Sequence, residues 1–199
     1  MKTKIKILLF VFFISSNFYG QLLNVNLGDA RGLFFSLGVG PRFAVGDFSS
    51  NHFFASGFEG IISYGDNESL PFFVYGKLNF ASFPAEFVNI LNKPSFEVYS
   101  RIYSLEPGVR YYFSPVSKEV VLLMPFVEGG LNLAVIHTVN QATTGYKVQF
   151  SNDEMKFGIH AGVGMSMFLL DALITYNYFY AYQFLGFTLR VRIPIFIKI

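Results

Sequence analysis

The stretch Phe157-Gly-Ile-His-Ala-Gly-Val-Gly-Met-Ser-Met167 alternates apolar side chains with small or polar ones along its whole length. Successive side chains of a β-strand point to opposite faces, so the pattern predicts a strand with one apolar face and one small or polar face. A helix would instead distribute these residues around its circumference. The stretch therefore predicts a protein built from β-strands.

The same alternation recurs in eight segments of the chain. These segments are longer than the roughly 5–6 residues of an average strand and suit the roughly 9–11 residues that a tilted strand needs to cross a bilayer. We therefore predict an all-β fold, an eight-stranded antiparallel transmembrane up-and-down β-barrel. The segments are Leu33–Val45, Phe58–Tyr64, Phe72–Ala81, Tyr103–Tyr111, Val127–Val135, Lys156–Met167, Ile174–Ala181 and Gly186–Ile195.

The two faces of the expected strands differ in charge. Charged groups that face hydrocarbon cost several kcal/mol each, so we expect the charged face to line the lumen and the apolar face to meet lipid. Inside, Glu59, Glu106 and Glu128 are expected to pair with the bases in a buried polar network. The expected lumen residues are Arg42, Glu59, Lys77, Glu106, Arg110, Glu128, Lys156, His160, Arg190 and Arg192.

The connections between the segments also follow a pattern. Gly65–Ser69, Ser114–Glu119 and Leu169–Asp171 are short and follow even-numbered strands, whereas Phe83–Glu97 and Val139–Asn152 are long and follow odd-numbered ones. Outer-membrane barrels have short periplasmic turns and longer outer loops, so both long loops are predicted to lie outside the cell. The connection between the last two strands is placed at Gln183–Leu185. Aromatic girdles are expected from Tyr64, Tyr103, Tyr111, Tyr112, Phe113 and Tyr182.

Composition agrees with a membrane protein. Of 199 residues, 52% are hydrophobic, 19% aromatic and only 14% charged, whereas soluble domains carry about 25% charged residues. The chain has no Cys, which excludes a disulfide framework and a thiolate metal site. The net charge of +2 is too small to indicate nucleic acid as a partner. We expect no cofactor and no metal ion.

The first residues resemble a secretory leader. Lys2, Lys4 and Lys6 precede the apolar run Ile7–Ile14, and small residues end at Gly20. We therefore expect a signal peptide over residues 1–20 and an outer-membrane β-barrel over residues 21–199. The alternative is an uncleaved anchor helix, but the apolar run is shorter than the ~20 residues that such a helix needs.

Four stretches carry a resemblance to known families: Asn17–Gln21 at the leader's end, Leu105–Phe113, Pro125–Leu133 and the closing strand Gly186–Ile193. They are similar to the outer membrane protein beta-barrel domain family, the porin-like and PorT-like small barrels of Bacteroidetes, with OmpA/OmpX-type architecture. The resemblance covers nearly all of residues 21–199. It implies a bacterial outer-membrane location, contact with outer-membrane lipid and lipopolysaccharide, and insertion by the barrel-assembly machinery. The family often ends on an aromatic residue, whereas this chain ends Phe196-Ile-Lys-Ile199.

The sequence favours a structural or surface-interaction role over catalysis or transport. Eight strands enclose an interior that side chains can fill, so a wide channel is not expected. An accessory role in a secretion machine, implied by the PorT-like resemblance, remains an alternative, as does a narrow channel. A lipid A-modifying enzyme would need a triad such as His137 and Ser151 with Asp153 or Glu154, but one such grouping is expected by chance among many polar loop residues, and ordinary polarity at the rim is the favoured interpretation. We predict that the protein is not an enzyme.

Overall fold

The computed structural model describes residues 31–66, 72–84, 96–114, 116, 123–142, 149–167 and 169–198. The expected leader, residues 1–20, lies outside these ranges. The described elements are β1 (Arg31–Val45), the short 3-10 helix η1 (Gly46–Ser50), β2 (Phe54–Asp66), β3 (Phe73–Phe83), β4 (Phe96–Tyr112), β5 (Leu123–Ala142), β6 (Gln149–Met167), β7 (Leu170–Phe179) and β8 (Tyr182–Lys198).

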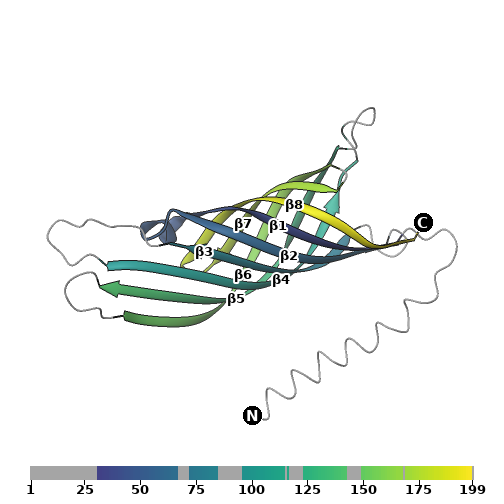
Figure 1. Cartoon of the computed structure of the whole chain (residues 1–199). Helices are drawn as coiled ribbons and strands as arrows, with labels where there is room; N and C mark the ends of the chain where they lie inside the picture. Colours follow the sequence, from purple (N-terminus) through teal and green to yellow (C-terminus); the bar gives the residue numbers. More distant parts are fainter. Residues whose placement is uncertain are drawn as a thin grey trace, which may run out of the picture.

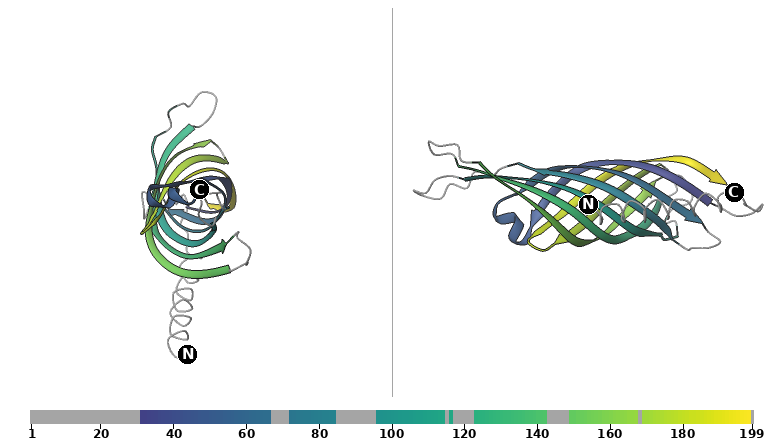
Figure 2. Two further views of the ribbon diagram at one scale, coloured as in Figure 1. Left: turned by 90° about the vertical axis from the view of Figure 1, so that its left-hand side faces the viewer. Right: turned by 90° about the horizontal axis from the view of Figure 1, so that it is seen from below.

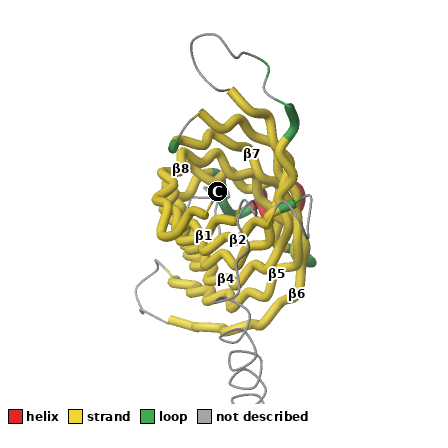
Figure 3. The backbone as a smooth tube through the Cα atoms, turned by 90° about the vertical axis from the view of Figure 1, so that its right-hand side faces the viewer, coloured by secondary structure: helices red, strands yellow, loops and turns green. Residues whose placement is uncertain are grey.

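The eight strands form a closed barrel in sequence order (Figure 1). Every neighbouring pair is antiparallel, and β1 closes the ring on β8 over a register from Arg31 opposite Lys198 to Val45 opposite Gln183. The ring is visible end-on in Figure 3. The predicted fold and strand count are confirmed. No helix within the described ranges is long and apolar enough to span a membrane.

The alternation of the sequence assigns each side chain to the lumen or to the exterior. In β7 every second side chain is buried, so Thr175 and Asn177 face inward while Ile174 and Tyr178 are exposed outward. The exterior is largely apolar, and the interior holds most of the charged groups, although Arg101 of β4 and Asp153 of β6 are exposed on the outward face. Large apolar side chains exposed on the outside include Val39, Ile62, Leu78, Leu131, Phe157, Ile174 and Leu189.

The barrel has two unlike ends. At the terminus end, Arg31 and Lys198 lie opposite each other. At the η1 end, β4, β5 and β6 run on beyond the other strands (Figures 1 and 2). The long loop expected over Val139–Asn152 is therefore largely strand, because Val139 pairs with Ser151 and Gln141 with Gln149. The alternation in the sequence predicts strands that end at Val135 and begin at Lys156, but a strand that extends beyond the bilayer can carry polar residues on both faces.

Three other boundaries also differ from the sequence-based expectation. The loop expected over Phe83–Glu97 is shorter, because β4 already begins at Phe96. The final connection is a tight turn at Tyr180 and Ala181, where Ala181 takes a left-handed φ of 67°. Asp171, expected in a turn, is the second residue of β7 and points inward.

Two of the aromatic residues expected in the outer girdles face the interior instead. Tyr112 contacts arginines near the terminus end of the lumen. Tyr182 packs against the apolar cluster at the η1 end. Both sit close to strand ends, where the alternation of the sequence is interrupted by the turn and the inward parity is hard to recognise.

Prolines interrupt two of the ladders in mid-strand. Pro107 lies in a gap of the β4–β5 ladder, between the pairs Leu105–Leu133 and Gly108–Gly130. Proline has no N–H to give to such a ladder. The Pro107 carbonyl lies 2.1 Å from where a Cβ on Gly130 would stand, so this close approach requires glycine. Pro41 interrupts the β1–β8 ladder in a similar way.

Candidate functional site in the barrel interior

The central lumen holds a network of charged side chains to which all eight strands contribute. Nine of the ten residues expected there are buried, and with Asp171 of β7 they form what we call the lumen charge network. Burying a charge is tolerated only when it is paired and hydrogen-bonded. The nine residues are Arg42, Glu59, Lys77, Glu106, Arg110, Glu128, His160, Arg190 and Arg192.

Glu128 of β5 lies at the centre of the network. Its carboxylate accepts from Arg110 Nη2 at 2.6 Å and from Arg190 Nη1 at 3.1 Å. Lys77 Nζ is 3.9 Å from the other oxygen of the same carboxylate. Three cations from three strands therefore share this carboxylate, as the charge pattern of the sequence predicted.

Glu106 of β4 forms a second centre. Lys77 Nζ lies 2.6 Å from its carboxylate, while Asn79 Nδ2 and Ser104 Oγ donate to it at 3.1 Å and 2.5 Å. His160 Nδ1 approaches Glu106 to 3.8 Å. These contacts join β3, β4 and β6 across the lumen.

His160 is held by neutral partners. Its Nε2 is 2.6 Å from the Tyr75 hydroxyl, and its Nδ1 contacts the side-chain oxygen of Asn132. Asn132 Nδ2 donates in turn to Asn177 Oδ1 at 3.2 Å. The expectation that His160 is a hydrogen-bonded lumen residue agrees with this geometry. Within the described residues, no group of three or more His, Cys, Asp or Glu side chains is arranged to hold a metal ion.

Glu59 of β2 and Arg190 of β8 meet across the intervening strand β1. Arg190 Nη2 and Nε donate to the same Glu59 oxygen at 2.6 Å and 2.9 Å. Gly38 lies opposite both residues in the two ladders. A Cβ on Gly38 would stand 2.8 Å from Glu59 Cγ, so glycine leaves the room in which the ion pair forms.

Asp171 is the network carboxylate that the sequence-based assignment missed. It accepts from Arg192 Nη2 at 2.6 Å and from Arg110 Nη1 at 3.4 Å. Its position after a short apparent turn suggested a loop residue. The two-residue alternation of the strand could have identified it, because counting back in steps of two from Asn177 and Thr175 places Asp171 on the inward face.

Lys156 is the expected lumen residue that lies outside the network. It has inward parity, but its side chain is 27% exposed and its Nζ pairs with Glu154 at 2.7 Å. The same Nζ lies 5.9 Å from the Tyr182 ring. The β6–β7 ladder ends with Gly158 opposite Phe179, so Lys156 lies beyond the end of β7 and its ammonium is not enclosed on that side.

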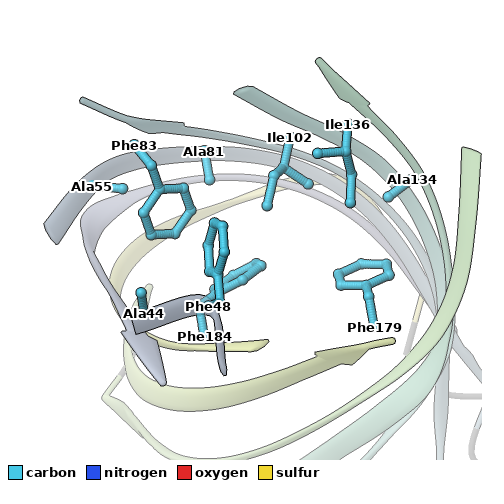
Figure 4. Packing of buried hydrophobic residues seen from close by; sticks show 10 residues of the cluster. All are labelled: Ala44, Phe48, Ala55, Ala81, Phe83, Ile102, Ala134, Ile136, Phe179 and Phe184. Carbon is cyan, nitrogen blue, oxygen red and sulfur yellow. The ribbon is translucent and has the colours of Figure 1, made fainter. Parts of the chain in front are cut away.

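A cluster of buried apolar side chains fills the lumen at the η1 end. This apolar layer comprises Ala44, Phe48, Ala55, Ala81, Phe83, Ile102, Ala134, Ile136, Phe179 and Phe184 (Figure 4). Phe48 enters from η1, its ring 4.8 Å from that of Phe83 and 5.3 Å from that of Tyr182. The sequence analysis expected a lumen that is polar throughout. The structure differs, because an apolar layer lies between the network and the η1 end.

His52 anchors the segment that carries Phe48. It is buried, its Nε2 lies 2.9 Å from Ser100 Oγ, and its Nδ1 lies 3.5 Å from the Pro84 carbonyl. Its ring is 4.6 Å from that of Phe48. Burial lowers the pKa of His52, and the Pro84 carbonyl opposes this only in part.

The possible triad around His137 lies on the extended strands. His137 of β5 faces Asp153 of β6 in the ladder, and its Nδ1 contacts the Asp153 carboxylate. Ser151 lies opposite Val139 instead. The His137 and Asp153 side chains are 35% and 69% exposed, so this pair lies at an open surface.

No protein-family model and no curated protein matches the chain. Among solved structures it is similar to Neisserial surface protein A (NspA), with 18% identity, 83% of this chain and 98% of that chain covered, and a TM-score of 0.43. It is also similar to Ail, the attachment invasion locus protein of Yersinia pestis, with 13% identity, 84% of this chain and 100% of that chain covered, and a TM-score of 0.46. A third similar structure is the N-terminal β-barrel domain of Pseudomonas aeruginosa OprF, with 15% identity, 80% of this chain and 97% of that chain covered, and a TM-score of 0.41.

The class of protein follows from the geometry. A closed, even-stranded antiparallel barrel with an apolar exterior and a polar interior has the architecture of small outer-membrane barrels. The chain is a closed eight-stranded antiparallel barrel with this architecture.

Proposed function

We propose that the chain is an integral outer-membrane protein with a structural or surface-interaction role and a lumen closed to solutes. The proposal rests on the filled interior. The lumen charge network occupies the centre of the barrel, and the apolar layer fills the lumen next to it at the η1 end. A water-filled path through the barrel would have to disrupt both the apolar layer and the lumen charge network. The extension of β4, β5 and β6 beyond the η1 end supplies a surface for contacts outside the membrane (Figure 2).

Solute flux tests the closed lumen. We expect vesicles that contain the purified protein to swell in isotonic arabinose no faster than protein-free vesicles. A variant with Phe48→Ala and Phe83→Ala should also stay closed, because the charge network beneath the apolar layer is intact. Swelling at porin-like rates by the unmodified protein would contradict the proposal.

The absence of catalysis is part of the same proposal. The exposed pair His137 and Asp153 contacts no serine hydroxyl among the described residues, which gives no support to a triad. Incubation with lipid A, followed by mass spectrometry, should return the lipid unchanged. A change in acyl content that His137→Gln abolishes would contradict this.

Origin and export remain proposals of the same kind. The stretches Leu105–Phe113 and Gly186–Ile193 support membership of the porin-like or PorT-like barrels of Bacteroidetes, with which a role beside a secretion machine would be compatible. Stable co-purification with secretion proteins would favour that role. For residues 1–20 we propose a leader, and the mass of the mature protein from outer membranes should correspond to a start at Gln21.

A further inference from the structure

β6 continues beyond its neighbour β7 at the η1 end. The β6–β7 ladder ends with Gly158 opposite Phe179, whereas the β5–β6 ladder continues to Gln149 opposite Gln141. From Gln149 to Phe157, β6 is therefore paired with β5 on one side and has no neighbouring strand on the other, within the part of the chain that the structure describes. We call this unpaired side the free edge of β6. β7 does not cover it, because the chain turns back there into β8.

The backbone of the free edge is already in the conformation that pairs with another strand. The β5–β6 ladder keeps one register, without a bulge, from Leu123 opposite Met167 to Gln141 opposite Gln149. A strand edge presents unpaired N–H and C=O groups, which are a template for a further strand. Proline and bulges often protect such edges, but residues 149–157 contain neither proline nor glycine. The free edge is therefore a preformed position for an added strand.

Two adjacent carboxylates lie in the middle of the free edge, one on each face of the sheet. Asp153 is on the outward face and exposed, while Glu154 lies opposite Ile136 on the inward face. Lys156 is the one Lys or Arg of residues 149–157, and its Nζ pairs with Glu154 at 2.7 Å. Two acids against one base leave the free edge with an excess of one negative charge. This charge favours a basic partner.

The outward face beside the free edge is apolar at its lower end, next to the tip of β7. Met155 and Phe157 of β6 are exposed there, and so is Tyr180, which follows the last residue of β7. Phe157 and Tyr180 are 79% and 77% exposed, although both are large and apolar. A strand added above the tip of β7 would cover part of this surface. The lower end of the free edge therefore favours an apolar side chain in the partner.

We propose that the free edge binds an extended segment of another protein that carries two consecutive basic residues. The segment adds to β6 as an antiparallel strand, in the position that a longer β7 would occupy. Because neighbouring side chains of a strand point to opposite faces, two consecutive cations reach Asp153 on one face and Glu154 on the other. An apolar residue just before the basic pair lies opposite Met155. The proposal rests on the proposed function, since it needs the η1 end to lie outside the membrane.

Peptide binding to the protein in phosphatidylcholine nanodiscs tests the charge preference. The probe is a fluorescent peptide of alternating Thr and Val with an Arg–Lys pair at its centre, and the matched control has Glu–Glu instead. Two exposed cross-strand ion pairs predict that the basic peptide binds roughly tenfold more tightly than the acidic one. N-methylation of every backbone amide should abolish binding, because the peptide can then donate no hydrogen bond to β6. Empty nanodiscs give the background.

Charge reversal separates the free edge from the general charge of the η1 end. Asp153→Lys combined with Glu154→Lys should reverse the preference, so that the acidic peptide binds more tightly. Asp47→Lys, at an exposed acid of η1, should leave the preference for the basic peptide in place. The shift of the folded band on unheated gels verifies that each variant is folded. An unchanged preference in the double variant would overturn the proposal.

Disulfide cross-linking locates the peptide on the sheet. Tyr99, Val139 and Ser151 form one row across β4, β5 and β6, and the chain has no cysteine of its own. A peptide with one Cys two residues after the basic pair should cross-link to Ser151→Cys faster than to Val139→Cys or Tyr99→Cys. Equal rates at all three positions would mean that the peptide lies on the face of the sheet. Either that result or a fastest reaction at Tyr99→Cys would overturn the proposal.

A water-soluble maleimide distinguishes failure of this proposal from failure of the proposed function. If the maleimide labels Ser151→Cys in nanodiscs but neither peptide binds, the free edge takes no strand and the proposed function stands. If the maleimide does not label Ser151→Cys, the η1 end does not lie in water, and this proposal falls together with the proposed function.

Discussion

Lys77 and Glu106 stand directly opposite each other in the β3–β4 ladder, and their charged groups meet 2.6 Å apart inside the barrel. Both side chains are buried. Their outward neighbour Leu78 is 66% exposed on the other side of the same wall. Neighbouring residues of β3 therefore lie in a buried ion pair and on the apolar exterior. Substitutions at the two positions should change the stability of the barrel by different amounts.

Removing one member of this pair should destabilise the barrel strongly. Glu106→Gln leaves the Lys77 ammonium with Glu128 at 3.9 Å, and loss of one partner of a buried pair costs about 3–5 kcal/mol. Leu78→Ala should cost less, because lipid fills the vacated space. Urea unfolding in lipid vesicles measures both changes in the free energy of unfolding.

The double variant is the control for this prediction. Lys77→Met combined with Glu106→Gln should be more stable than the sum of the single losses predicts, because neither remaining group is an unpaired charge. Strictly additive losses would show that the two side chains do not interact in the folded protein.

Acid should weaken closure of the η1 end through His52. In the closed state η1 and His52 pack in the mouth of the barrel, and in an open state they would be released into water. Because burial lowers the pKa of His52, the open state binds a proton more readily than the closed state. Closure is therefore fully stable above the ordinary histidine pKa of about 6.5, and it weakens below it by at most about 1.4 kcal/mol per pH unit for one proton. Amide hydrogen exchange over residues 46–53, corrected for intrinsic rates, should show less protection at pH 5.5 than at pH 7.5.

Two histidine variants assign that effect. His52→Gln should remove the pH dependence of protection, and His137→Gln, at the exposed pair with Asp153, should leave it unchanged. Equal protection at both pH values in the unmodified protein would contradict a role for His52 in closure.

The connections at the two ends of the barrel predict its orientation in the membrane. Epitope tags inserted at Asn92 and Thr144 should bind antibody on intact cells, because both loops join strands at the η1 end. Tags at Asp66 and Ser117, toward the terminus end, should bind only after the cells are permeabilised. The reverse labelling pattern would show that the protein has the opposite orientation in the membrane.

The lumen charge network was largely predictable because alternation is local. Glu106 and Arg110 occupy inward positions that two-residue periodicity alone assigns, and opposite charges in one lumen must pair. The register that brings Glu106 against Lys77 was not predictable, since it depends on how neighbouring strands shift along each other. Asp171 was missed because a short turn hid its parity.

The apolar layer was not predicted because it depends on tertiary contacts. Phe48 lies in the short segment Gly46-Asp-Phe-Ser-Ser50, which reads as an ordinary loop. Only closure of the ring brings it against Phe83 and Tyr182. Lys156 was misplaced for a related reason, because parity gives the face of a residue but not its height along the barrel.

The accessibility of the exterior of β6 tests the central claim most directly. The chain has no cysteine, so single spin labels at Phe157→Cys, Ile159→Cys, Ala161→Cys and Val163→Cys in vesicles report one site each. An exterior that meets lipid predicts high collision rates with oxygen and low rates with a water-soluble nickel chelate at all four sites. Val116→Cys, which is exposed in the β4–β5 connection, should show the opposite. Frequent collisions of the nickel chelate at all four β6 sites would mean that this face meets water, and would contradict a membrane barrel.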